Sequence, residues 1–157
     1  MNNPYEADME KNAANFTSLS PLSFIKRTAA AYPSKPAVIH GQIKRNWAQT
    51  YTRMKQLASA LSEQGIGIGD CVAIIAPNIP EMIEAHFGIP MTGGIINALN
   101  TRLDASTIAF ILEHGEAKIL ITDTEFSPTI KEALSLLEKK PYVIDIVDSE
   151  GPGGERL

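Results

Sequence analysis

The feature that most constrains the fold is an alternation of short apolar runs with helical segments in the second half of the chain. The runs are rich in β-branched residues and stand between turn residues, which is typical of buried strands. In chain order the predicted elements are a strand at 71–76, a helix at 80–92, a strand at 95–99, a helix at 105–114, a strand at 118–122, a helix at 128–140 and a strand at 142–147. This order predicts βαβ units with right-handed crossovers, and therefore an α/β fold of Rossmann-like layers with a mainly parallel sheet flanked by helices.

A helix and a short hairpin precede the alternating region. Ser20 and Pro21 have the cap and first-turn chemistry of a helix start, and Gly41 marks the turn of the hairpin. Asn46 and Gln49 have capping-box spacing before a second helix, which Gly65 ends. The apolar face of that second helix is predicted to comprise Tyr51, Met54, Leu57, Ala58 and Leu61. We divide the chain into an N-terminal arm at 1–17, one domain at 18–150 and a turn or linker at 151–157.

Charge and composition exclude several classes of partner. The net charge is -4 and no run of Lys or Arg interrupts it, so we expect no nucleic-acid partner. The single cysteine, Cys71, has no partner for an internal disulfide, which favours a reducing compartment. The start of the chain lacks a secretory signal, and the apolar runs are far shorter than the roughly 20 residues that span a bilayer. We therefore expect a cytoplasmic protein without a membrane span.

Two glycine-rich stretches invite comparison with phosphate-binding loops. In "GIGIGD" (65–70) the third glycine of the G-x-G-x-x-G fingerprint is replaced by Asp70, and the stretch precedes a strand instead of opening a helix. "GPGGE" (151–155) follows a strand, but only Glu155, Arg156 and Leu157 come after its glycines, without the helix a phosphate loop requires. We interpret the first as a helix stop with a turn and the second as a flexible turn or linker.

The histidines do not form a recognisable catalytic or metal site. His86 falls on the apolar side of the 80–92 helix, so we expect it to pack or hydrogen-bond in the core instead of acting as a catalyst. His40 and His114 are expected in a turn and at a helix end. The neighbours that place His86 on the apolar side are Met82, Ile83, Ile89 and Pro90, opposite a stripe of Glu81, Glu84, Gly88 and Thr92. No histidine pair has metal-ligand spacing, and no G-x-S-x-G elbow or base-activated nucleophile is present.

Polar residues at the carboxyl ends of the predicted strands are the remaining candidates. Open α/β sheets bind ligands at this edge, which points to Asn78, to Asn100–Thr101–Arg102 and to Asp123. Arg102 has the chemistry to bind a phosphate or a carboxylate. The alternative, which we favour, is that Asn100 and Asp123 cap or turn the chain and Arg102 forms a surface salt bridge.

The order of these elements resembles the N-terminal region of the adenylate-forming superfamily of acyl-CoA synthetases, luciferases and adenylation domains. "NWAQTY" is similar to the family's Leu-Thr-Tyr-x-Glu-Leu element, although Trp47 and Gln49 depart from it. "GIGIGDCVAIIAPNIPEM" is similar to the Gly-x-Gly-Asp-x-Val strand followed by Pro-Asn-x-Pro-Glu, and "PMTGGIINALN" to the Ala-Gly-Ala…Pro-Leu-Asn segment. The stretch from His86 to Asp123 is similar to short- and medium-chain acyl-CoA ligases, including methylmercaptopropionate-CoA ligases and plant acyl-activating enzymes.

The resemblance implies that residues 18–150 are part of the N-terminal domain of a longer AMP-binding ligase of fatty acid metabolism. Such an enzyme converts a carboxylic acid and Mg²⁺-ATP to an acyl-adenylate, then transfers the acyl group to coenzyme A. The family's Pro-Lys-Gly phosphate loop, adenine region, ribose-binding Asp and catalytic Lys have no counterpart in this chain. The resemblance therefore assigns no catalytic, cofactor-binding or metal-binding residue here.

Three interpretations of the chain remain open at this point. The first is a fragment of such a ligase that is inactive alone, with exposed strand edges that favour self-association or a homo-oligomer. The second is a self-sufficient Rossmann-like module that binds a nucleotide or regulates another protein. The third, minor one is a shortened paralogue that acts only through protein contacts.

Overall fold

The computed structural model describes residue 12 and residues 16–157, so most of the predicted arm at 1–17 lies outside the described residues. The first half holds helix α1 (Pro21–Ala31), the hairpin strands β1 (Pro36–His40) and β2 (Ile43–Asn46), and helix α2 (Trp47–Glu63). The second half alternates β3 (Cys71–Ile75), α3 (Pro80–Met91), β4 (Ile95–Ala98), α4 (Ala105–His114), β5 (Ala117–Asp123), the 3₁₀ turn η1 (Thr124–Phe126), α5 (Ser127–Ser135) and β6 (Tyr142–Ile146).

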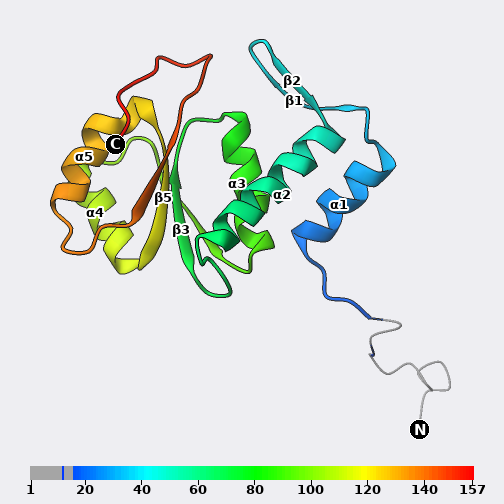
Figure 1. Ribbon diagram of the computed structural model, residues 1–157, viewed down its shortest axis with the longest axis horizontal. Helices are drawn as coiled ribbons and strands as arrows, with labels where there is room; N and C mark the ends of the chain where they lie inside the picture. Colours follow the sequence, from blue (N-terminus) through cyan, green and yellow to red (C-terminus); the bar gives the residue numbers. More distant parts are fainter. Residues whose placement is uncertain (1–11, 13–15) are drawn as a thin grey trace, which may run out of the picture.

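The second half forms a four-stranded sheet in the order β4-β3-β5-β6, with every neighbouring pair parallel. The predicted α/β fold with a parallel sheet is therefore confirmed. Helices α4 and α5 lie on one face of the sheet and α2 and α3 on the other, as Figure 1 shows. Since β3 is enclosed by strands on both sides and by helices on both faces, all five of its residues are buried.

The alternation of side chains along each strand creates two hydrophobic cores. Ala73, Ile75 and Leu120 face α4 and α5 and pack with Ile108 and Ile130. Val72, Ile74, Ile119 and Ile121 face the other way and pack with Leu61, Ala85 and Ile89 from α2 and α3. We call these the α4/α5 face and the α2/α3 face of the sheet.

The residues predicted to cap the starts and ends of the helices do so in the structure. The Ser20 hydroxyl accepts a hydrogen bond from the Leu22 amide, and the Asn46–Gln49 capping box is complete, with both bonds 2.9 Å long. Asp104 accepts from the Thr107 amide at 2.8 Å and so caps α4. Gly65, directly after the α2 cap, has φ +83°, a conformation that glycine adopts without a steric cost.

Helix α5 ends earlier than the predicted limit of 140. It ends at Ser135, and the chain then tightens through backbone bonds from Leu136 to Ala133 and from Leu137 to Leu134. This turn buries Leu137 in the core of the α4/α5 face, with 8% of its surface exposed. Burial of one leucine side chain, worth about 2 kcal/mol, outweighs the helix propensity of "LEKK".

The segment at 151–157 has no regular secondary structure, as expected of a turn or linker, but it is held against the domain. The Ser127 hydroxyl donates to the Glu155 carbonyl, and the Lys131 ammonium lies 2.9 Å from the Glu155 carboxylate. The Leu157 amide donates to the Asp145 carboxylate of β6 at 3.1 Å. No local pattern indicates these contacts, because they join residues at least 12 positions apart.

Candidate functional site

The strand order identifies one crevice at the carboxyl edge of the sheet. The chain leaves β3 toward α3 on one face and leaves β5 toward α5 on the other, and β3 and β5 are neighbours. Such a point, where adjacent strands lead to opposite faces, is where open α/β sheets bind ligands. Of the predicted residues, Asn78 follows β3 and Asp123 ends β5, so both flank this point, whereas Asn100–Thr101–Arg102 follows the outer strand β4.

Asp123 is almost completely enclosed, with 2% of its surface exposed. Its Oδ1 accepts a hydrogen bond from the Glu125 amide at 2.9 Å, so Asp123 caps η1 as the favoured alternative proposed. Its Oδ2 has no hydrogen-bond partner among the described residues. Burial, with the neighbouring charges of Asp123 and Asp148, raises the pKa of Glu125 above its ordinary value. This part of the edge therefore carries a local excess of negative charge.

The "NTR" loop after β4 forms a turn and lies apart from the crevice. The Asn100 side chain accepts a hydrogen bond from the Arg102 amide at 2.9 Å, which is an Asx turn, and all three residues are exposed. Within residues 16–157 no ion pair of Arg102 is present, so its predicted surface salt bridge is not seen. Asn78 is exposed as well.

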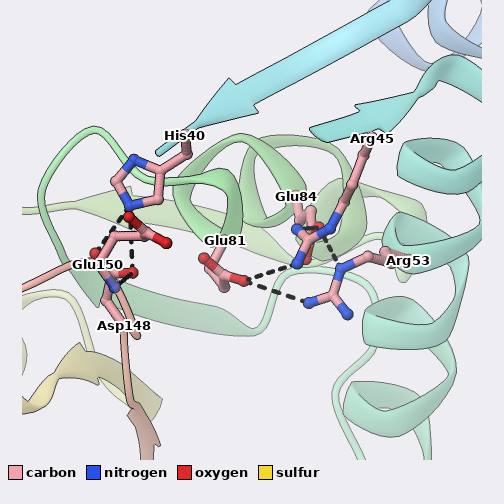
Figure 2. Close-up of polar contacts among 7 residues, drawn as sticks. All are labelled: His40, Arg45, Arg53, Glu81, Glu84, Asp148 and Glu150. Atoms are coloured by element: carbon pink, nitrogen blue, oxygen red, sulfur yellow. Dashed lines mark hydrogen bonds and ion pairs between the residues drawn. The ribbon is translucent and has the colours of Figure 1, made fainter. Parts of the chain in front are cut away.

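The β1–β2 hairpin lies across the carboxyl edge and is held by charged side chains, as Figure 2 shows. Arg45, next to the end of β2, donates from Nη1 to Glu84 Oε1 of α3 at 2.8 Å. Arg53 of α2 donates from Nε to the same oxygen, and both arginines lie within 4 Å of the Glu81 carboxylate. The Glu84 side chain is only 5% exposed. We call Arg45, Arg53, Glu81 and Glu84 the arginine–glutamate cluster.

The prediction for the faces of α3 is wrong at His86 and at the supposed outer stripe. Glu84 and Gly88 face α2 and are buried, whereas His86 is exposed and its Nδ1 lies 2.8 Å from the Met82 carbonyl of its own helix. Two causes override the apolar pattern. Two arginines neutralise Glu84, and Gly88 permits close approach, since a Cβ there would lie 2.9 Å from the Leu57 side chain.

A second contact holds the opposite end of the hairpin. His40 Nε2, at the end of β1, lies 3.0 and 3.2 Å from the two carboxylate oxygens of Asp148, just beyond β6. Burial opposes the charged form of Asp148, but the Glu150 amide and the His40 ring outweigh it and lower the pKa of Asp148. This His40–Asp148 pair joins residues 108 positions apart, so no sequence pattern could have indicated it.

The remaining candidate groups have structural surroundings. His114 stacks on Phe110 of the same helix, with ring centroids 5.4 Å apart. Cys71 is buried, and burial raises the pKa of its thiol. In the described part of the chain no group of three or more His, Cys, Asp or Glu side chains is arranged to hold a metal ion. Across the same residues, no helix combines the length and apolarity needed to cross a bilayer.

Comparison with known proteins decides the family. Residues 25–156 match the AMP-binding enzyme family. The chain belongs to that family. An acetate–CoA ligase of Humulus lupulus is 46% identical over 149 residues, which cover 91% of this chain and 26% of that protein. A peroxisomal acetate/butyrate–CoA ligase of Arabidopsis thaliana is 48% identical over 133 residues, covering 85% of this chain and 23% of that protein.

These AMP-binding relatives are much longer than the chain, which spans about a quarter of their length. Among solved structures, an anthranilate–CoA ligase in complex with anthranoyl-AMP superposes with a TM-score of 0.78. The alignment has 23% identity and covers 87% of this chain and 27% of that one, so it shows a shared fold. The relatives confirm the resemblance to acyl-activating enzymes that the sequence motifs indicated.

Proposed function

We propose that this chain forms the N-terminal part of an AMP-forming acyl-CoA synthetase. The whole enzyme would activate a carboxylic acid with ATP and Mg²⁺ and transfer the acyl group to coenzyme A. The observation that carries the proposal is the family match over residues 25–156, together with 46–48% identity to two CoA ligases. Since both of those relatives act on acetate by name, a short-chain acid is the substrate class we propose.

The role of the described residues in this enzyme is to build and position a scaffold. Phosphoryl and adenylyl transfer need donors and cations where negative charge develops. The carboxyl edge near β5 and β6 instead carries the negative groups Asp123, Glu125 and Asp148, and the cationic groups of the arginine–glutamate cluster are bound to glutamates. We infer that the triphosphate binds to residues beyond this chain and that the chain alone does not catalyse the reaction.

A chimera tests the proposal. The corresponding quarter of the Humulus acetate–CoA ligase is replaced by residues 1–157, and acetyl-CoA formation is measured. We expect an active chimera, because the relatives share the fold and nearly half of the residues. In ATP–pyrophosphate exchange the 157-residue chain should be silent with acetate and butyrate. A folded but inactive chimera, or turnover by the chain alone, would contradict the proposal.

An independent nucleotide-binding module is the second candidate. One observation favours it. Asp123 Oδ2 is an acceptor beside the crevice without a partner among the described residues, and a carboxylate at a strand end suits a ribose hydroxyl. Calorimetric titration of the chain with ATP, AMP, NAD and coenzyme A distinguishes the candidates. Binding of any of the four in the micromolar range supports the module, and silence toward all four favours the ligase scaffold.

The compartment is also a proposal. We propose a cytoplasmic enzyme on the grounds of its single, buried cysteine and acidic charge. The Arabidopsis relative is named as peroxisomal, so the two locations compete. Fractionation of cells that express the full-length protein separates them, and enrichment with peroxisomes would reject the cytoplasmic assignment.

A further inference from the structure

The two parts of the chain differ in charge, although the net charge of -4 conceals this. Residues 16–62 contain seven Lys or Arg and no Asp or Glu, whereas residues 63–157 contain six Lys or Arg and 15 Asp or Glu. The basic stretch forms α1, the β1–β2 hairpin and α2, which lie at the end of the molecule remote from α4 and α5 (Figure 1). Such a separation of charge favours an anionic partner for the basic end.

Five of the seven basic side chains have no acidic partner among the described residues. Arg45 and Arg53 are bound to the glutamates of the arginine–glutamate cluster. The other five are exposed and form no ion pair with a described residue: Lys26, Arg27, Lys35, Lys44 and Lys55. They come from two helices, one strand and the loop before β1, so no run of Lys or Arg marks them in the sequence.

Exposed apolar side chains stand beside two of these cations on α1. Leu19 is 88% exposed and Phe24 is 56% exposed, and both line an apolar hollow of about 300 Å³ that reaches Phe87 of α3. Arg27 follows Phe24 by three positions, so the two side chains share one side of the helix. Lys26 is exposed next to them. We call Leu19, Phe24, Lys26 and Arg27 the α1 patch.

The α1 patch has the chemistry that binds an anionic lipid bilayer. Lipid headgroups supply negative charge across the whole surface, so Lys26 and Arg27 need no partner at a fixed position. Leu and Phe side chains enter the boundary between headgroups and acyl chains without a preformed pocket. A nucleic-acid backbone offers the same charge but no apolar layer for an aliphatic side chain such as Leu19.

A protein partner fits the α1 patch less well than a bilayer. A stable protein interface takes roughly 800 Å² of surface from each partner, around a well-packed apolar centre. The apolar residues of the patch are confined to the start of one 11-residue helix. The acidic end of a second copy would supply negative charge, but contacts between opposite ends of the chain are heterologous and do not close into a dimer.

We propose that the α1 patch binds the surface of membranes that contain anionic phospholipids. Helix α1 would lie along the surface, with Lys26 and Arg27 at the headgroup phosphates and Leu19 and Phe24 inserted below them. The three other unpaired cations would add a longer-range attraction that salt screens. The proposal concerns where the protein is held and does not depend on the catalytic function proposed above, so each can fail without the other.

Vesicle flotation tests the proposal, because floating vesicles leave aggregated protein at the bottom of the gradient. The 157-residue chain is mixed with vesicles of phosphatidylcholine alone, or with vesicles that also contain about 30% phosphatidylserine. We expect at least about tenfold tighter binding to the anionic vesicles, and weaker binding in about 0.5 M NaCl.

Two double variants test the cations. Lys26→Gln with Arg27→Gln should weaken binding to the anionic vesicles about 25-fold, which is roughly fivefold for each cation. Lys139→Gln with Lys140→Gln is the matched control, because it removes the same charge from two exposed neighbouring lysines outside the basic end. The control should change the binding by less than about twofold, since these lysines lie beyond the range of the screened headgroup charge.

A pair of single variants tests the apolar contact. Phe24→Ser should remove most of the binding that remains in about 0.5 M NaCl, because salt does not screen the insertion of an apolar side chain. Leu136→Ser is the control, since Leu136 is 58% exposed but follows α5 and lies far from α1 in Figure 1. Circular dichroism of each variant checks that it is folded.

Four results would overturn the inference. The first is equal binding to neutral and anionic vesicles, or none to either. The second is an equal loss of binding for the two double variants. Duplex DNA that binds as tightly as the anionic vesicles, with no effect of Phe24→Ser, would assign the cations to a nucleic acid. Light scattering without lipid that reveals association, and that the Lys26→Gln, Arg27→Gln variant abolishes, would assign the α1 patch to a second copy.

Discussion

The two ends of the β1–β2 hairpin are fastened by charged groups in different surroundings. At one end, the arginine–glutamate cluster binds a Glu84 side chain that is 5% exposed. At the other end, the His40–Asp148 pair joins a histidine with 25% of its side chain exposed to an aspartate with 6%. Figure 2 shows both contacts side by side at the carboxyl edge of the sheet.

This difference teaches that the number of cationic partners and their permanent charge matter more than the formal presence of an ion pair. A buried carboxylate that loses its cations leaves an uncompensated charge, which costs several kcal/mol. Asp148 is as buried as Glu84, but it keeps the Glu150 amide as a donor at 3.0 Å, and water can replace the partly exposed His40 ring, so the loss of His40 costs less. We therefore expect the loss of the contact at the α3 end of the hairpin to destabilise the fold strongly. The loss of the contact at the β6 end should destabilise it only weakly.

The largest effect is expected for Glu84→Ala. It leaves Arg45 and Arg53 without their shared partner and should lower the free energy of unfolding by about 3 kcal/mol. Urea unfolding followed by the fluorescence of Trp47, the single tryptophan at the start of α2, measures it. Glu81→Ala is the control, because its side chain is 25% exposed, and we expect a loss below about 1 kcal/mol. Equal losses of stability for both variants would contradict the expectation that Glu84 contributes more than Glu81.

Gly88→Ala tests the close approach that accompanies the cluster. The added Cβ would lie 2.9 Å from Leu57 Cδ2 and 3.0 Å from the Met54 carbonyl oxygen, so α2 and α3 must separate. We expect a loss of about 1–3 kcal/mol in the same unfolding measurement. Gly67→Ala is the matched control, since a Cβ there meets nothing within 4 Å. A stabilised Gly88→Ala variant would show that helix propensity outweighs packing here.

The His40–Asp148 pair should show a coupling of about 0.5–1 kcal/mol in a double-mutant cycle of His40→Ala and Asp148→Asn. The pKa of Asp148 is lowered in the folded state, so its contribution is present above the unfolded pKa and is lost as the pH falls through the folded value. The cycle is therefore measured at pH 6 and again at pH 3. A coupling above about 2 kcal/mol would place this pair in the same class as the cluster.

The smallest effect, with the opposite sign, is expected at Glu125. Burial and the charges of Asp123 and Asp148 raise its folded pKa, so its contribution is favourable below the unfolded pKa and is lost as the pH rises. Glu125→Gln should therefore stabilise the chain slightly at pH 7 and leave it unchanged at pH 3. Thermal unfolding at both pH values checks this, and a destabilised variant at pH 7 would show that Glu125 has a cationic partner there.

The parts of the fold that were predictable from sequence depend on neighbours within a few residues. Ser20, the Asn46–Gln49 box and Asp104 cap their helices because each bonds an amide two or three positions away. The strands follow from runs of β-branched residues, and the parallel sheet from their alternation with helices. The family resemblance followed from motif order, which the relatives confirm.

The parts that were not predictable depend on contacts between distant residues. Glu84 is buried because Arg45 and Arg53, which lie 39 and 31 positions away, reach it, and no helical periodicity contains that information. The strand order, which separates Asn100–Arg102 from the crevice near Asp123, emerges only when the sheet assembles. The strand-end rule pointed to this edge of the sheet but could not choose between its loops.

The place of β3 in the middle of the sheet has a consequence for biosynthesis. Ile74 pairs with Ala98 of β4 on one side and with Ile121 of β5 on the other, so its second neighbour is made 47 residues later. At about 5–20 residues per second, a ribosome needs roughly 2–10 s to cover that distance. During that interval one hydrogen-bonding edge of the most apolar strand stays unpaired, which is when the nascent chain is most exposed to aggregation and to chaperones.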